Sequence, residues 1–324
     1  MTVASLVSPI GGVVSYVREA DGAFFASAGR GRHPELAPPL IGAGVTEDDA
    51  VRRALALYAA AAWDAKLMQW SSADELGDEA IPVEELARVA PLETRDRIRW
   101  VEGFALDDGR PIWVPAILVC LGLPAAVEPE GFWPPSLAGL AVGDDLGSAV
   151  LGGLLDLVAR DACAIAGARG VSLPRLVSGE GEPALFDATS DLGIPTVLAG
   201  ESDEVGMAAA ATSNLARTAA IDDLTRKKAR RARGIYPTEP RAEVQAGAVS
   251  EIAPADNDDP IDLAKPAIVA RLRRVGLAGY AVDLTTDELE HAGLSAVRVV
   301  VPGLSPVPPT SGWNDHARLA RVAP

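Results

Sequence analysis

The chain has 324 residues, of which 48% are hydrophobic, so it can bury a large core. Its formal net charge of −16 argues against a nucleic-acid partner, because phosphate binding requires a basic surface. The longest apolar stretch, residues 112–127, contains two prolines and is too short to span a bilayer as a helix. We therefore expect no membrane partner, and we interpret this stretch as a buried strand entering a loop.

The first third of the chain predicts strands followed by a helix. Residues 6–17 carry Val, Ile and Tyr around Gly11 and Gly12, which predicts a strand pair or a bulged strand. Thr46 is a predicted helix N-cap, because acidic residues follow it where the helix dipole favours negative charge. Ala-rich sequence carries this helix past Trp63.

The middle of the chain predicts a short helix, a hairpin and a long helix. The short helix is expected near residues 83–89. Strands at 100–106 and 111–119 flank an Asp-Asp-Gly turn, a typical hairpin signal. The long helix begins after Asp145 and reaches about Ala168.

The last third of the chain also predicts alternating strands and helices. We expect a strand at 191–199, a helix from Ala208 to about Arg231 that opens at Thr212 or Ser213, and strands at 280–284 and 297–301. The basic run at 226–233 is interpreted as a solvated helix end. Between about 232 and 263, six Pro or Gly residues and an acidic cluster predict a mobile surface loop.

These elements predict a mixed α/β fold in which long helices pack on β-sheet, as a single domain over residues 1–324. Cys120 and Cys163 lie in apolar sequence without a CxxC motif, so we expect two reduced thiols that act as small hydrophobes. The N-terminal residues lack a basic segment followed by a long apolar core, so they do not predict a signal peptide. We therefore expect a cytoplasmic protein.

One segment occurs twice: a Gly-bounded turn, a polar helix start and a long helix. The first copy contains Gly42, Ala43 and Gly44 and continues to Trp63. The second begins at Gly139 and continues to Asp161. Both copies resemble the signature helices of the YcaO family, in particular its azoline-forming cyclodehydratases. These ATP-dependent enzymes activate backbone amides of ribosomally made peptides.

Further landmarks extend the resemblance over the whole chain. In family order, they are Leu6 to Val14, Asp191 to Pro195, Val282 to Asp287, Gly293-Leu294 and Arg298 to Leu304. Walker A, GxGxxG, HExxH and GxSxG motifs are absent from the sequence.

The resemblance implies a nucleotide site whose groups this chain has lost. In active members, paired glutamates on one helix face hold Mg²⁺ against the phosphates of ATP. In the first copy, the Lys, Ser, two Glu and Arg positions hold Ala43, Arg53, Leu57, Ala60 and Ala61. We expect Leu57 and Ala60 to be buried, with the former cleft partly filled by Leu, Ala and Trp side chains.

The second copy and the third family helix are also altered. The Glu positions of the second copy hold Asp156 and Ala159, while Arg160 and Asp161 are kept. In the third helix, Asp223 and Arg226 stand where the family has Glu and Gln. An Asp is one methylene shorter than a Glu, so it would end about 1 Å short of a ligand distance built for Glu.

Two functions stay open at this point. The first is a YcaO-like pseudoenzyme that serves as a structural or regulatory subunit in a complex making azole or azoline natural products, such as bacteriocins. Its vestigial site would hold no cofactor. The alternative is a divergent ATP-dependent cyclodehydratase that binds Mg-ATP through Asp156, Asp161 and Asp223. An unrelated α/β protein is a third, weaker possibility.

By resemblance, the partners would be an active cyclodehydratase, other peptide-modifying proteins or the precursor peptide, and a homodimer stays open. The chain shows no leader-binding domain ahead of the first copy, so we expect another chain to recruit the substrate.

Overall fold

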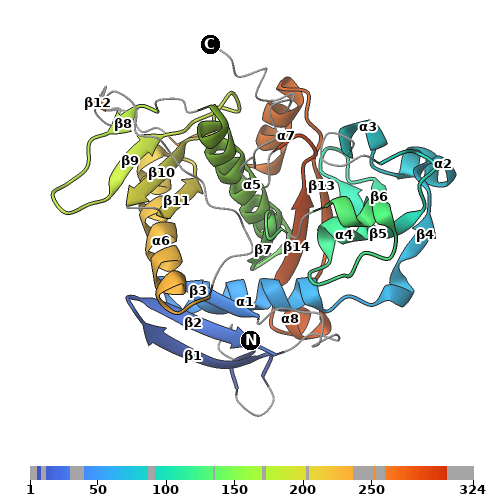
Figure 1. The fold of residues 1–324 in the computed structure, drawn as a ribbon, viewed down its shortest axis with the longest axis horizontal. Coiled ribbons are helices and arrows are strands. Elements are labelled where there is room, and N and C mark those ends of the chain that lie inside the picture. The colour runs from blue at the N-terminus through green and yellow to red at the C-terminus, as the bar shows by residue number, and fades with distance from the viewer. Residues whose placement is uncertain are drawn as a thin grey trace. The chain divides into compact units, whose positions relative to one another are not determined.

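The computed structural model describes residues 6–8, 12–29, 40–86, 92–133, 136–169, 173–201, 204–235, 251–252 and 260–304 (Figure 1). The chain forms two compact units. Unit 1 comprises Met1–Glu19, Phe24–Gly153 and Gly276–Gly303. Unit 2 comprises Ala20–Ala23, Leu154–Val275 and Leu304–Pro324.

Unit 1 is built on two sheets. The first has the order β1-β2-β3, with strands β1 (Val14–Ala20), β2 (Ala23–Ala28) and β3 (Ile41–Gly44). The second has the order β4-β5-β13-β14-β7, and β6 also pairs with β5. Its strands are β4 (Gln69–Ser71), β5 (Ile98–Ala105), β6 (Pro111–Pro115), β7 (Leu140–Gly143), β13 (Tyr280–Asp283) and β14 (Ser295–Val300).

Helix α1 (Glu47–Ala61) covers both sheets of unit 1, because it packs on β3, β7 and β14. The helix lies very close to β3: a Cβ atom added to Gly42 would stand 2.1 Å from the carbonyl oxygen of Ala50. Only glycine permits this approach. The shorter helices are η2 (Ala65–Leu67), α2 (Ala73–Leu76), η3 (Gly77–Glu79), α3 (Val83–Leu86), α4 (Ala116–Val119), η4 (Glu128–Phe132) and α8 (Asp287–His291).

Unit 2 contains a sheet of order β11-β10-β9-β8-β12. Its strands are β8 (Arg175–Leu176), β9 (Ala184–Asp187), β10 (Thr196–Glu201), β11 (Glu204–Ala209) and β12 (Glu251–Ile252). Helix α6 (Ser213–Ala232) packs on β10 and β11. Helix α7 (Lys265–Arg274) belongs to this unit, and α5 (Leu146–Arg169) starts in unit 1 and belongs to unit 2 from Leu154.

The predicted mixed α/β class, with long helices on sheets, is confirmed. Thr46 and Thr212 are the N-caps of α1 and α6, and each side-chain oxygen accepts a main-chain N–H three residues on. Cys120 and Cys163 are free and buried, as expected. Among the helices that the structure describes, none is long and apolar enough to cross a membrane.

Several local predictions were wrong. The first hairpin turns at Asp21-Gly22 rather than at Gly11-Gly12, of which residue 11 lies outside the described residues. Residues 116–119 form α4 instead of extending the strand that ends at Pro115. Residues 191–195 precede β10 as a turn and loop, and Ala208-Ala209 end β11 rather than opening α6.

The mobile loop predicted at about 232–263 falls largely outside the described residues, so its mobility stays a prediction. Within it, β12 pairs parallel to β8. The basic run at 226–233 is not simply solvated, because Lys228 forms an ion pair with Glu201 and Arg231 forms one with Glu204.

Candidate functional site

The first candidate segment is the joint between β3 and α1. Gly42, Ala43 and Gly44 form the end of β3, and Ala43 is buried. A Cβ atom on Gly44 would lie 2.5 Å from the main-chain nitrogen of Ala50, so both glycines are required by the closeness of the helix. The joint is therefore closely packed, and Ala43, which we assign to the family's Lys position, carries only a buried methyl group.

Four further positions of this motif lie on α1. Arg53 is exposed and forms an ion pair with Asp49, and the other three are apolar. Ala60 and Ala61 are each 1% exposed, which confirms the expectation for Ala60. Leu57 is half-buried and packs against the unit 1 core from the edge of the helix's buried face, so its predicted full burial was wrong. None of these three side chains carries a polar atom that could bind a metal or a phosphate.

The second segment is the joint between β7 and α5. Asp145 is the first residue before α5, and one of its carboxylate oxygens accepts the main-chain N–H of Ser148 at 2.6 Å. This bond and the contact with the Ser148 hydroxyl lower the pKa of Asp145. The neighbouring Asp144 binds Arg52 of α1 at 2.7 Å, and Arg52 also binds Asp48. This ion pair within unit 1 links the two copies, and sequence spacing gave no signal for it.

In unit 2, α5 carries the altered signature positions of the second copy. The carboxylate of Asp156 binds the guanidinium of Arg160 at 2.7 Å, one helical turn away. Ala159 is buried, and Asp161 is fully buried. Asp156, which stands at a Glu position, and the retained Arg160 are therefore bound to each other.

The third segment is the joint between β11 and α6, also in unit 2. The carboxylate of Asp223 is 8% exposed and accepts the main-chain N–H of Met207 at 3.0 Å. It forms ion pairs with Arg226 and, at 2.9 Å, with Lys227. Gly206 allows this close packing, because a Cβ atom there would lie 2.1 Å from the carbonyl oxygen of Ala220.

The alternative hypothesis requires Asp156, Asp161 and Asp223 to converge. Over the part of the chain that the structure describes, no three His, Cys, Asp or Glu side chains are grouped so that they could hold a metal ion. The three aspartates, all in unit 2, are thus not brought together as one site. A metal ion would have to compete with Arg160 for Asp156, and with two cations for Asp223.

The residues at these positions therefore do not fit Mg-ATP. Mg²⁺ takes oxygen ligands in near-octahedral geometry, often one or two carboxylates together with the phosphates. Here two assigned carboxylate positions, Ala60 and Ala159, carry buried methyl groups, and a third carries the half-buried Leu57. Two others carry carboxylates bound by cations of their own helix. The chemistry that remains in these segments is that of structural ion pairs and apolar packing.

A second buried ion pair was missed by the sequence reasoning. Glu130, whose side chain is fully buried in unit 1, binds the guanidinium of Arg99 at 2.5 Å and accepts the main-chain N–H of Ala126 at 2.7 Å. Burial alone would raise the pKa of Glu130, but these hydrogen bonds lower it below its ordinary value. The pair joins residues 31 positions apart, so no local pattern predicts it.

Comparison with known proteins identifies one family for this chain. The YcaO family model, described as YcaO cyclodehydratase, ATP- and Mg²⁺-binding, matches residues 41–305. A search of curated proteins gave no match.

Three solved structures share the fold. A heterocyclase in complex with substrate and cofactor has a TM-score of 0.72 and 19% identity over 94% of this chain and 51% of that chain. YcaO from Methanopyrus kandleri, bound with AMPPCP and Mg²⁺, has a TM-score of 0.69 and 21% identity over 90% and 85%. The E. coli microcin synthetase McbBCD complex has a TM-score of 0.61 and 13% identity over 90% and 87%. The chain spans about half the length of the heterocyclase.

Proposed function

Because this chain belongs to the YcaO family, we propose that it is a member without nucleotide chemistry, acting as a structural or regulatory subunit of a complex that forms azolines in ribosomally made peptides. The observation that carries this proposal is the environment of Asp223. Its carboxylate is bound by Arg226, by Lys227 and by the main-chain N–H of Met207. The position that corresponds to a family glutamate therefore has its charge satisfied within its own unit.

The charge balance argues against a metal ion at this position. A carboxylate with two cations already carries a local excess of positive charge, and a divalent cation would add to it. Arg226 makes the excess permanent, because a guanidinium is not deprotonated in proteins. The family Gln at this position would be neutral and could accept or donate a hydrogen bond.

The remaining positions support the same proposal. Ala60 and Ala61 are buried in the core of unit 1, and Ala43 is buried at the end of β3. A buried alanine offers neither a ligand for Mg²⁺ nor a charge for a phosphate. The packing of α1 on the two sheets is kept, so the scaffold is maintained where its chemistry is lost.

The proposed partners are an active cyclodehydratase, another peptide-modifying protein or the precursor peptide. Solved relatives of this fold include a heterocyclase in complex with substrate and the E. coli microcin synthetase complex, which supports an assembly role. A stable interface buries roughly 1,200 to 2,000 Å². A divergent active cyclodehydratase is the alternative, and it would require Asp156 and Asp223 to exchange their cations for Mg²⁺.

Isothermal titration calorimetry with Mg-ATP tests the proposal. We expect no measurable binding, because a cation, two carboxylates and a guanidinium are missing from the first motif copy. A family member with intact glutamates, titrated under the same conditions, is the positive control. A dissociation constant in the low micromolar range, about −8 kcal/mol, would favour the alternative.

A further inference from the structure

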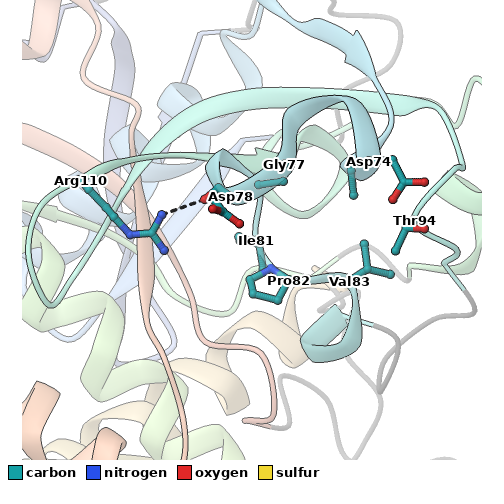
Figure 2. Close-up of a pocket in the computed structure, with 10 residues that line it drawn as sticks. Asp74, Gly77, Asp78, Ile81, Pro82, Val83, Thr94 and Arg110 are labelled. Carbon is teal, nitrogen blue, oxygen red and sulfur yellow. Dashed lines mark hydrogen bonds between the residues drawn. The ribbon is translucent and has the colours of Figure 1, made fainter.

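A cavity of about 690 Å³ lies in unit 1, and no residue of the three candidate segments lines it. It is formed by the chain from α2 to the start of α3, together with Thr94 and Arg110. Figure 2 shows Asp74 and Gly77 on one side of it, with Pro82 and Val83 on the opposite side. This volume is within the range of ligand pockets in proteins, about 300 to 1,000 Å³.

The cavity has an apolar wall. Ala80, Ile81 and Val83 line it, and all three residues are at most 6% exposed. They belong to the main hydrophobic core of unit 1, together with Trp100 of β5. The core fixes this wall but covers most of it, and the apolar surface open to a bound side chain is that of the exposed Pro82 beside it.

The rim of the cavity is acidic. Asp74 and Asp78 are exposed, and within the described residues neither carboxylate has an ion-pair partner. The only cation in the lining, Arg110, donates a hydrogen bond to the carbonyl oxygen of Asp78 at 2.9 Å and lies 3.7 Å from the carboxylate of Asp108. Counted with Asp108, the rim thus has three carboxylates and one guanidinium, which leaves an excess of negative charge.

Main-chain groups of the cavity wall are already used. The N–H of Ala80 binds the carbonyl of Gly77, and the N–H of Ile81 binds the carbonyl of Trp113. Pro82 has no N–H. A ligand could therefore not add to this segment as another strand through its N–H groups, and recognition would depend on side chains: apolar groups on the wall and cations at the rim.

We infer that this cavity is a docking site for a peptide segment that combines an apolar residue with a nearby lysine or arginine. The apolar side chain would pack on Pro82 and the accessible edges of Ala80 and Val83, and the cation would lie between Asp74 and Asp78. The charge complementarity selects a basic peptide, because an acidic or phosphorylated one would be repelled by the rim and by the net charge of −16.

Docking at this cavity goes beyond the proposed function and does not depend on it. The cavity is made of residues of unit 1 that belong to none of the vestigial nucleotide positions. A binding assay without nucleotide therefore tests docking alone. Failure of peptide binding would leave the result with Mg-ATP unchanged, and the reverse also holds.

Fluorescence anisotropy with the purified full chain tests the inference. The probe is a fluorescein-labelled peptide of alternating leucine and lysine, and the comparison peptide alternates leucine and glutamate. We expect saturable binding of the lysine peptide only, which weakens as NaCl is added. The double variant Asp74→Asn/Asp78→Asn should lose affinity about tenfold, within the roughly thirtyfold that two exposed ion pairs of up to about 1 kcal/mol each can contribute.

Two further variants separate docking from general attraction. Glu288→Gln/Glu290→Gln removes two exposed charges from α8 in the same unit and should bind the lysine peptide as the unmodified chain does. Thr94→Trp keeps both rim carboxylates, fills the cavity and should abolish binding. No binding by the unmodified chain, equal losses in the two charge variants, or full binding by Thr94→Trp would each overturn the inference.

Discussion

At the scale of single residues, the positions that we assign to the family's signature groups are of two kinds. At Ala60 and Ala61 the side chains are apolar and buried in the core. At Asp156 and Asp223 the carboxylates remain, but each is bound by a cation of its own helix. In both cases a metal ion finds no unpaired carboxylate at the position. The two cases make different predictions for mutation.

Restoring glutamates on α1 should destabilise the protein without restoring activity. Ala60→Glu places a carboxylate at a position that is 1% exposed, which should cost about 3 kcal/mol of unfolding free energy. Leu57→Glu affects a half-buried side chain and should cost only about 1 kcal/mol. Urea unfolding of the two single variants measures this difference. Equal, negligible costs would show that the helix face is open to solvent.

The Glu130–Arg99 pair makes the free energy of unfolding depend on pH in the acid range. The pKa of Glu130 is lowered in the folded protein, so its contribution is complete above its ordinary value of 4.5 and is lost as the pH falls through the folded pKa. Unfolding free energy should therefore decrease more steeply below that pH in the unmodified chain than in Glu130→Gln. Parallel pH profiles of the two proteins would contradict this assignment.

At the scale of elements, the molecule uses one structural device in both units. A glycine within a strand lets the following helix touch the strand backbone, as Gly42 does under α1 and Gly206 under α6. Each helix is capped by a threonine, Thr46 or Thr212. The strand–helix joints are therefore kept by backbone packing that is independent of any catalytic side chain.

Alanine at either glycine should be strongly destabilising. The added Cβ atom would lie 2.1 Å from a helix carbonyl oxygen in both Gly42→Ala and Gly206→Ala, so the helix must shift. We expect a cost of about 3 kcal/mol in each, as for overpacked cores. The control is Gly131→Ala, whose Cβ atom would be 3.9 Å from its nearest neighbour and should change the melting temperature little. Gly42→Ala and Gly206→Ala proteins as stable as this control would refute the packing argument.

Elements with local signals were the predictable ones. Thr46 and Thr212 begin helices through side-chain bonds three residues away, and the β5–β6 hairpin follows from its Asp-Asp-Gly turn. The Asp21-Gly22 turn carries an equally strong signal, which was overlooked in favour of Gly11-Gly12. Helix α4 follows Pro115 in an apolar run whose composition fits a strand equally well. Tertiary packing therefore decides whether this run is a helix or a strand.

The motif register of the candidate site stays a prediction from the sequence, whereas the environment of its residues comes from the structure. The motif spacing placed Ala43, Ala60 and Asp223 at the altered positions, and their residue types alone indicated the loss of ligands. Only some of the partners of Asp223 could be predicted from sequence spacing. Arg226 and Lys227 lie three and four residues further along the same helix, whereas the main-chain N–H of Met207 comes from β11. The cavity beside Asp74 was not predicted, because it depends on Ile81 packing into a core built by distant strands.

At the scale of the whole molecule, a YcaO scaffold without its nucleotide groups is expected to be maintained for its contacts. We predict a stable complex with a second copy or with an active family member. Deleting residues 236–250 should leave this assembly intact, since their Pro- and charge-containing sequence offers no contiguous apolar patch. Light scattering of the chain alone and mixed with its candidate partners measures this. A strict monomer in every mixture would contradict the subunit role.

The most direct test of the central claim is ATP turnover by the purified chain, measured as inorganic phosphate release with excess Mg²⁺ and with the candidate partner proteins and precursor peptide added one at a time. A family member with intact glutamates provides the positive control. We predict that this chain alone releases no phosphate above the buffer rate, and that any release in mixtures is unchanged by Asp156→Asn or Asp223→Asn in it. Mg²⁺-dependent release by this chain that either substitution abolishes would contradict the account and identify it as a divergent cyclodehydratase.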